Sequence, residues 1–152
     1  MKEIKLDLLR WYSRPVIKLY GVEALIDTGA EIPVFSLSEH ELKRLFNAEL
    51  LLKRGAVRGF GGEFTGAVYR LYDFRIDELY YPKMKVLVPD DLSNGFFRMI
   101  LSASMFHNLS CNIDFKNHQL SIVVPENESL RRDIRVLDSQ GNEHIMTNTN
   151  PL

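Results

Sequence analysis

The chain has 152 residues, of which 45% are hydrophobic and 26% are charged, and its formal net charge is −1. This composition is typical of a globular domain and argues against a disordered chain. The balanced charge argues against nucleic acid as a partner, and the lack of an apolar run of about 18 residues argues against a membrane-spanning segment.

The first part of the chain is predicted to form strands around a short turn. Residues Lys2 to Leu8 alternate between apolar and charged side chains, which indicates a half-buried strand, and a second extended run follows from Val16 to Tyr20. An apolar approach from Glu23 to Ile26 leads into the turn sequence Asp27-Thr28-Gly29. The run from Glu31 to Leu37 then continues as a further strand.

A short helix is predicted after these strands. Ser38 and Glu41 have the spacing of a capping box, in which each side chain accepts a hydrogen bond from the other residue's backbone. Leu37 and Leu42 occupy the positions of a hydrophobic staple around this cap. The helix is therefore expected to run from Glu39 to about residue 46.

The middle of the chain is predicted to be mainly extended. Residues 55–64 contain four glycines, and segments 67–76 and 84–88 are rich in β-branched and aromatic side chains. Residues 96–109 are apolar with small residues at their centre, which indicates a buried strand followed by a helical turn. Residues 111–124 place apolar side chains on both sides of an Asn-His turn, which indicates a hairpin.

The end of the chain is more polar. Residues 134–137 and 144–146 flank a polar run that is typical of a turn, so they form a candidate hairpin. We therefore expect one domain over residues 1–124 and a polar C-terminal extension over residues 125–152, with the hairpin followed by a flexible end.

One short motif carries chemistry. The run Ala24-Leu25-Ile26-Asp27-Thr28-Gly29-Ala30 is an apolar strand that ends in an acid, a small hydroxyl residue and glycine. Gly29 permits a close backbone approach, the amides of Gly29 and Ala30 can bond the carboxylate, and the Thr28 hydroxyl can cross-link neighbouring backbone groups. The alternative is an ordinary β-turn, because the triplet arises by chance in on the order of a few per cent of chains of this length.

The context of this motif resembles the retropepsin family, the single-domain dimeric aspartic proteases, whose signature is an apolar strand entering D-T/S-G-A. Residues 24–30 match that signature, and residues 57–64 resemble the glycine-rich flap of the family, with Gly59, Phe60, Gly61 and Gly62 at its tip. Residues 99–106 are similar to the second apolar segment, usually I-L-G followed by a short helix. Residues 112–117 resemble a strand near the end of the family's domain, so the similarity spans roughly residues 16–124.

The resemblance implies a mainly β acid-protease barrel with one or two short helices and a flap hairpin. It also implies an aspartic endopeptidase without a cofactor, which hydrolyses a peptide or protein substrate. The chain has a single D-T-G, so two copies must pair, each supplying Asp27 as the catalytic residue, with Thr28, Gly29 and Ala30 as support. One Asp27 would activate a water, and the other would hydrogen-bond the scissile carbonyl.

The segment Leu101-Ser102-Ala103 departs from the family pattern, because Ser102 stands where glycine is usual. Serine fits there if its φ is negative and its hydroxyl finds a partner. The departure keeps a second hypothesis open, namely a catalytically inactive module of the same fold that binds a peptide or protein. A third hypothesis is a protease that becomes active only after trimming or within a larger assembly, since the tail exceeds the family's minimal domain.

Other polar residues are given structural roles. The four histidines have no metal-ligand spacing, so no metal is expected, and the single cysteine, Cys111, favours the cytoplasm. Ser102 and Ser104 lack a nucleophile elbow, and residues 59–62 lack the spacing of a phosphate loop. The remaining residues considered are assigned to the surface or to packing: Asp73, Asp77, Asp90, Asp91, Asp114, Trp11, Tyr12, Tyr80 and Tyr81.

Overall fold

The computed structural model describes residues 1–30, 32–59, 62–91, 97–134, 136–137 and 143–144. The fold is mainly β, as predicted, with one short α-helix and one 3₁₀ helix in the described part of the chain. The strands are β1 (Lys2–Asp7), β2 (Val16–Leu19), β3 (Val22–Asp27), β4 (Val34–Phe35), β5 (Asn47–Gly59), β6 (Gly62–Ile76), β7 (Leu79–Pro89), β8 (Met99–Ser102), β9 (Ser110–Asp114), β10 (Gln119–Val124), β11 (Val136–Leu137) and β12 (Glu143–His144). The helices are α1 (Glu39–Leu45) and η2 (Ala103–Phe106).

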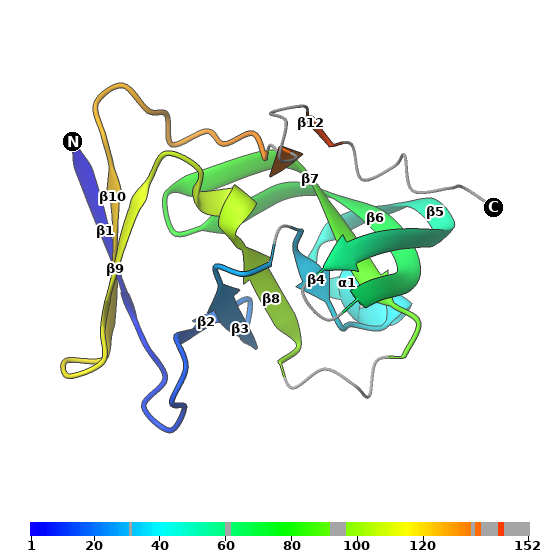
Figure 1. Cartoon of the computed structure of the whole chain (residues 1–152), viewed down its shortest axis with the longest axis horizontal. Helices are drawn as coiled ribbons and strands as arrows, with labels where there is room; N and C mark the ends of the chain where they lie inside the picture. The colour runs from blue at the N-terminus through cyan, green and yellow to red at the C-terminus, as the bar shows by residue number, and fades with distance from the viewer. Residues whose placement is uncertain (31, 60–61, 92–96, 135, 138–142, 145–152) are drawn as a thin grey trace.

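Seven strands form the largest sheet, in the order β2-β3-β8-β4-β7-β6-β5. At its centre β3 pairs parallel with β8, and the short strand β4 joins β8 to β7 (Figure 1). The described strands do not close into the barrel that the family resemblance implies, because β2 and β5 remain the two edges of this sheet. Closure requires strands of matched length and stagger, whereas β5 and β6 have 13 and 15 residues and β4 has two.

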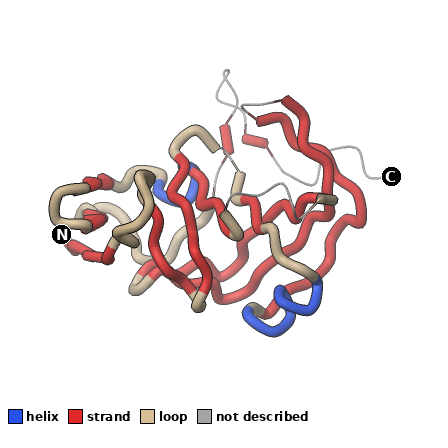
Figure 2. The backbone as a smooth tube through the Cα atoms, turned by 90° about the horizontal axis from the view of Figure 1, so that it is seen from below, coloured by secondary structure: helices blue, strands red, loops and turns tan. Residues whose placement is uncertain are grey.

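A separate sheet of three antiparallel strands, β1-β10-β9, lies at the end of the molecule that holds the N-terminus (Figures 1 and 2). It contains the predicted N-terminal strand and the predicted hairpin. In the turn of that hairpin Asp114 accepts hydrogen bonds from the backbone and side chain of Asn117, and His118 has a φ of 53°. Buried side chains of β1 and β10 join those of β2, β3, β6, β7 and β8 in one hydrophobic cluster, so the two sheets share a core.

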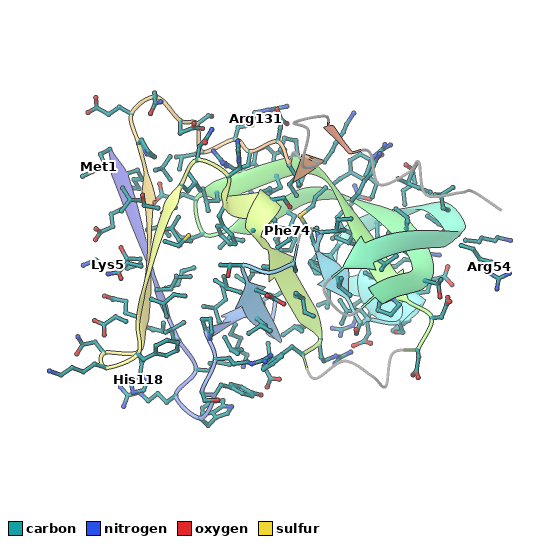
Figure 3. The ribbon with its side chains drawn as sticks, in the orientation of Figure 1. Met1, Lys5, Arg54, Phe74, His118 and Arg131 are labelled. Carbon is teal, nitrogen blue, oxygen red and sulfur yellow. The ribbon has the colours of Figure 1, made fainter. Side chains whose placement is uncertain are left out.

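Aromatic rings fill the other end of this core. Phe74 of β6 is buried and lies in the middle of the molecule (Figure 3). Its ring centroid lies 5.8 Å from that of Phe35, 5.7 Å from that of Phe46 and 6.0 Å from that of Tyr81. Aromatic pairs at such distances stabilise a core beyond their buried area.

The helix α1 begins as the sequence predicts. The Glu41 backbone N–H donates to the Ser38 hydroxyl at 3.1 Å, and the Ser38 N–H donates to the Glu41 carboxylate at 3.1 Å. Both halves of the capping box are thus present. Leu37 and Leu42 are fully buried beside this cap, so the apolar face of the short helix is anchored in the core.

Two strand boundaries differ from the sequence prediction. Within the expected run 31–37 only Val34–Phe35 is a strand, because Pro33 has no N–H to donate, and residue 31 lies outside the described residues. Strand β5 begins at Asn47, although Ala48, Glu49 and the leucines after them favour a helix. Pairing with β6 along its length overrides that local preference.

Candidate active site

The Asp27 carboxylate is held by its own turn. Asp27 is the last residue of β3, and the backbone N–H of Gly29 donates to its Oδ1 at 2.9 Å. A Cβ atom on Gly29 would lie 3.3 Å from the same oxygen, so a larger residue would crowd the carboxylate. The turn therefore fixes one carboxylate oxygen by a charge-assisted hydrogen bond.

Two details of this turn differ from the sequence interpretation. The Ala30 N–H donates to the backbone carbonyl of Asp27 at 3.1 Å and closes the turn, instead of bonding the carboxylate. The Thr28 side chain is exposed, and its hydroxyl makes no hydrogen bond to a residue that the structure describes. The predicted backbone cross-link by Thr28 is therefore not formed within the described part of this chain.

Ser102 is the residue directly paired with Asp27 across the parallel strands β3 and β8. It is fully buried, and its backbone is extended with φ −90° and ψ 160°. Its hydroxyl lies 2.6 Å from the hydroxyl of Ser104. Both conditions for a serine at this position are met, because the φ is negative and the hydroxyl has a partner.

The start of η2 is attached to the Asp27 turn. The Ala103 N–H donates to the backbone carbonyl of Ala30 at 2.9 Å. Residues 27–30 and 101–103, which the sequence assigned to two different motifs, are thus brought together by β3, β8 and this hydrogen bond. Strand pairing explains the contact, since neighbouring strands lie about 4.8 Å apart.

The described residues of the segment that resembles a flap, 57–59 and 62–64, lie in the long hairpin of β5 and β6. Gly59 pairs with Gly62 at the end of the ladder, and Phe60 and Gly61 lie outside the described residues. The pairing register shifts twice between Leu50 and Gly55, which marks β-bulges on β5. Arg54, near these bulges, points out to solvent (Figure 3).

The hairpin extends past β7 beyond Gly66, the last residue toward the tip at which β6 pairs with β7, and this point is called the hairpin base. Gly66 pairs with Pro89, and a Cβ atom on Gly66 would lie only 2.1 Å from the backbone oxygen of Val88. Beside it the Thr65 hydroxyl donates to Asp90 Oδ2 at 2.9 Å, and the Asp90 N–H donates to the Thr65 carbonyl at 3.2 Å. Gly66 and Thr65 belong to no motif in the sequence, although a lone glycine in a strand pattern indicates a close backbone approach.

A second apolar cluster joins the hairpin to the segment after the Asp27 turn. Val68 of β6 and Leu87 of β7 are buried at its centre. The partly buried side chains packed against them are Ile32, Val34, Leu51 and Leu52. Val68 and Leu87 are fully buried, so only the partly buried side chains around them leave apolar atoms accessible between the segment after the Asp27 turn and the bulged part of β5.

Three of the other aspartates considered, Asp73, Asp90 and Asp114, take part in hydrogen bonds, and two lie in a turn or past the end of a strand. Asp73 accepts a hydrogen bond from the Tyr80 hydroxyl, and Asp90 holds Thr65. The hydrogen bonds from Asn117 lower the pKa of Asp114, so this exposed carboxyl favours its ionised form. Asp77 has a φ of 54° in the turn between β6 and β7, and Asp91 lies just past the end of β7.

Among the aromatic residues considered, Tyr81 is buried and donates its hydroxyl hydrogen to the Met105 carbonyl at 2.7 Å. Burial raises the pKa of Tyr81 well above its usual range. Tyr80 lies at the surface under Arg75, whose guanidinium carbon is 4.2 Å from the ring centroid. Tyr12 packs against Phe97, whereas the Trp11 side chain is 73% exposed.

A small pocket lies at the opposite end of β3 from Asp27. Its volume is about 220 Å³, which is below the roughly 300–1,000 Å³ typical of small-molecule sites. Its lining residues are Leu9, Trp11, Lys18, Gly21, Val22, Glu23 and Arg98. The guanidinium of Arg98 is already paired with Glu41, so this pocket is the weaker candidate for a functional site.

No group of three or more His, Cys, Asp or Glu side chains in the described residues is arranged to hold a metal ion. The described helices include none that is long and apolar enough to cross a membrane.

Comparisons with known proteins give no relative. No protein-family model, no curated protein and no solved structure matches the chain. The features that point to a function are the residues themselves, above all residues 27–30 and 101–103, which the fold joins.

Proposed function

We propose that the protein is an aspartic endopeptidase that is active as a homodimer in which two copies of Asp27 share one site. The observation that carries this proposal is the turn at the end of β3. There the Gly29 N–H holds Asp27 Oδ1 at 2.9 Å, and the paired residue on the parallel strand β8 is the buried Ser102. A carboxylate fixed in this way is ready to act as an acid or base.

A second copy is needed because hydrolysis by this chemistry uses two carboxyl groups in contact. The other described aspartates that were considered have roles in turns or in hydrogen bonds to Tyr80, Thr65 and Asn117. Thr28 and Gly29 are exposed beside the partly exposed Asp27, so the face that would meet a second copy is not covered by its own described residues. A two-fold axis near this face would bring the two carboxyl groups together.

The proposed chemistry follows from this juxtaposition. Two like charges a few ångströms apart cannot both ionise, so the pair would hold one proton. The ionised carboxylate would take a proton from a bound water as that water attacks the scissile carbonyl carbon. The protonated carboxyl group would hydrogen-bond the carbonyl oxygen, and no covalent enzyme intermediate forms.

The substrate is proposed to be an extended peptide. The β5–β6 hairpin offers backbone groups for strand-like pairing, and its closure would exclude water from the site. The partly buried side chains of Ile32, Val34, Leu51 and Leu52, which pack on the buried Val68 and Leu87, supply some apolar surface next to the Asp27 turn. The alternative is a binding module of the same architecture without catalysis, and the departure from glycine at Ser102 is the feature that favours it.

The decisive variant is Asp27→Asn. The asparagine amide oxygen can still accept the hydrogen bond from the Gly29 N–H, so the turn should persist while the ionisable group is lost. The assay is cleavage of a peptide library from acidic to neutral pH, with Asp7→Asn as control because Asp7 is exposed on β1. Loss of all cleavage in Asp27→Asn alone supports the proposal, whereas a wild-type chain that binds peptides without cutting them supports the binding module.

A further inference from the structure

The segment after β10 returns to the main sheet and pairs with β7. The Tyr80 N–H donates to the Leu130 carbonyl at 2.8 Å, and the Arg132 N–H donates to the Tyr80 carbonyl at 2.7 Å. These bonds form an isolated parallel bridge between Tyr80 and Arg131. Leu130 and Ile134 pack against the main hydrophobic core. Residues 128–132 are therefore built into the fold beside β7.

Arg132 is the most deeply buried charged residue in this segment, with 5% of its surface exposed. Its Nη1 donates to Glu128 Oε2 at 3.2 Å and to the Ser129 carbonyl at 3.3 Å. Its Nη2 donates to the carbonyl of His107, which directly follows η2. Burial of a guanidinium is costly unless its donors are used. Nη1 and Nη2 are used, and their contacts fix where the group lies, whereas Nε is buried without a hydrogen-bond partner among the described residues.

The carbonyls of Met105 and Phe106 in η2, and that of His107 just after it, each accept a hydrogen bond. The Tyr81 hydroxyl donates to the Met105 carbonyl, the Leu109 N–H donates to the Phe106 carbonyl, and Arg132 donates to that of His107. The end of a helix otherwise leaves such carbonyls without partners. Two of the three donors come from distant parts of the chain, so β7 and the C-terminal segment together determine the position of this end.

The other end of η2 is attached to the Asp27 turn through the hydrogen bond from the Ala103 N–H to the Ala30 carbonyl. A 3₁₀ helix rises about 2 Å per residue, so the four residues of η2 form a rod of roughly 8 Å. η2 is therefore the direct covalent link between the carbonyls held at its far end and the Ala103 N–H held at the Asp27 turn.

We propose that Arg132 is a positioning residue for the Asp27 turn, acting through η2. The proposal rests on the proposed function for its catalytic consequence, since a displacement of about 1 Å in a catalytic group can cost on the order of a hundredfold in rate. The structural claim does not depend on that function, because the contact of Arg132 with the His107 carbonyl would restrain η2 and the Ala103 amide whether or not the protein is a protease. Residues 128–132 thereby help to hold the Asp27 turn in place.

The test compares Arg132→Lys with the matched substitution Arg131→Lys. Lysine at position 132 keeps the charge but cannot reach Glu128, Ser129 and His107 with one planar fork. Arg131 is exposed and lies at the surface beside β7, with its guanidinium 5.9 Å from the Tyr80 ring centroid (Figure 3). A third variant, Glu128→Gln, weakens the ion pair and leaves the contact with His107 in place.

We expect Arg132→Lys to speed hydrogen exchange of the Ala103 amide about tenfold or more, while amides of β10 change little. It should lower kcat about tenfold with KM within about twofold, because the orientation of the reacting groups is disturbed more than substrate binding. Arg131→Lys should change neither the exchange rate of the Ala103 amide nor kcat. Glu128→Gln should lower the unfolding midpoint without speeding exchange at Ala103.

Unchanged exchange at Ala103 in Arg132→Lys, or equal changes in Arg131→Lys, would overturn the proposal. A loss of kcat that equals the loss of folded protein would also overturn it, because such a loss reflects stability alone. If the wild-type protein shows no Asp27-dependent cleavage, the proposed function fails and the exchange result alone decides the positioning role. If Arg132→Lys does not fold, Tyr81→Phe removes the donor to the Met105 carbonyl at the same end of η2. Faster exchange at Ala103 in this variant supports the proposal that this end of η2 holds the Asp27 turn, and unchanged exchange overturns it.

Discussion

Asp27 and Ser102 are paired residues on adjacent parallel strands, and the residues that follow them are joined by the hydrogen bond between Ala103 and Ala30. Serine causes no backbone strain at this position, because its φ of −90° lies in the broad extended region that side chains readily allow, so the freedom of glycine is not needed. Its hydroxyl is used in a 2.6 Å contact with Ser104. Ser102 is thus compatible with the geometry that the proposed catalysis requires.

The first prediction concerns this hydroxyl. Ser102→Ala should lower the free energy of unfolding by about 1 kcal/mol, because a buried hydrogen bond is lost. Ser102→Gly should cost about 0.5–1 kcal/mol more, because glycine is entropically unfavourable in a strand. Urea unfolding measures both changes, and peptide cleavage should persist in both variants. Abolished cleavage in folded Ser102→Ala would instead mean that the hydroxyl takes part in the chemistry.

The second prediction concerns the close approach of β6 and β7 at Gly66. Gly66→Ala should destabilise the protein by about 2–3 kcal/mol or more, because the new Cβ atom would lie 2.1 Å from the Val88 carbonyl oxygen and backbone atoms must move. Gly21→Ala is the matched control, since Gly21 has a φ of +75° and open space around its Cβ position. It should cost only about 1–2 kcal/mol of backbone strain. Equal thermal unfolding midpoints for the two variants would contradict the close approach.

The third prediction concerns the clip between Thr65 and Asp90 at the base of the hairpin. Thr65→Val removes the 2.9 Å hydrogen bond and keeps the β-branched shape. Because the pair is exposed, the free energy of unfolding should fall by no more than about 1 kcal/mol. KM for a peptide substrate should rise by several-fold, since the hairpin base is less fixed when substrate binds. Steady-state kinetics checks this, and an unchanged KM would show that Gly66 and the strand ladder suffice to hold the base.

The fourth prediction is a pH dependence at the start of α1. The backbone N–H of Ser38, and further the Arg98 guanidinium, lower the pKa of Glu41 below its ordinary value of 4.5. A carboxyl group with a lowered folded-state pKa contributes stability above its unfolded-state pKa and loses it as the pH falls through the folded-state pKa. Wild type should therefore exceed Glu41→Gln in stability at pH 7 by about 0.3–1 kcal/mol, because the glutamine oxygen can still accept from the Ser38 N–H and only the negative charge is lost.

The difference between wild type and Glu41→Gln should shrink as the pH falls below about 4.5, because wild-type Glu41 then becomes neutral as well. Chemical denaturation of both proteins at a series of pH values measures it. Glu39→Gln is a control on the same helix turn, where Lys43 lowers the pKa of a fully exposed carboxyl and the effect on stability should be smaller. A difference that is constant from pH 7 to pH 3 would contradict the role of the ionised Glu41.

The elements that the sequence predicted well are those whose signals are local. The capping box of Ser38 and Glu41, the strand before Asp27 and the turn at Asn117 are each specified within a few residues, and each is present. The extent of β4 and β5 was not predicted correctly, because it depends on Pro33 and on pairing with distant strands. The missing barrel closure has the same cause, since closure depends on the relative lengths of strands across the whole sheet.

The candidate site was predicted in part for the same reason. Residues 27–30 carry a recognisable local pattern. Their contact with residues 101–103 depends on the pairing of two strands that are far apart in the sequence. Arg132 gave no signal, because a lone arginine in a polar tail looks like a surface residue until its burial and its contact with His107 are seen. Thr65 and Gly66 were likewise inconspicuous, since their partners Asp90 and Val88 are more than 20 residues away along the chain.

The central claim is that one site is built from the Asp27 residues of two chains, and mixing experiments test it most directly. Wild-type protein is mixed with increasing amounts of Asp27→Asn, allowed to exchange subunits, and assayed for peptide cleavage per wild-type chain. At a ninefold excess of the variant, activity should fall to about a tenth, because most wild-type chains then pair with an inactive partner. Activity per wild-type chain that stays constant at every ratio would contradict a shared site.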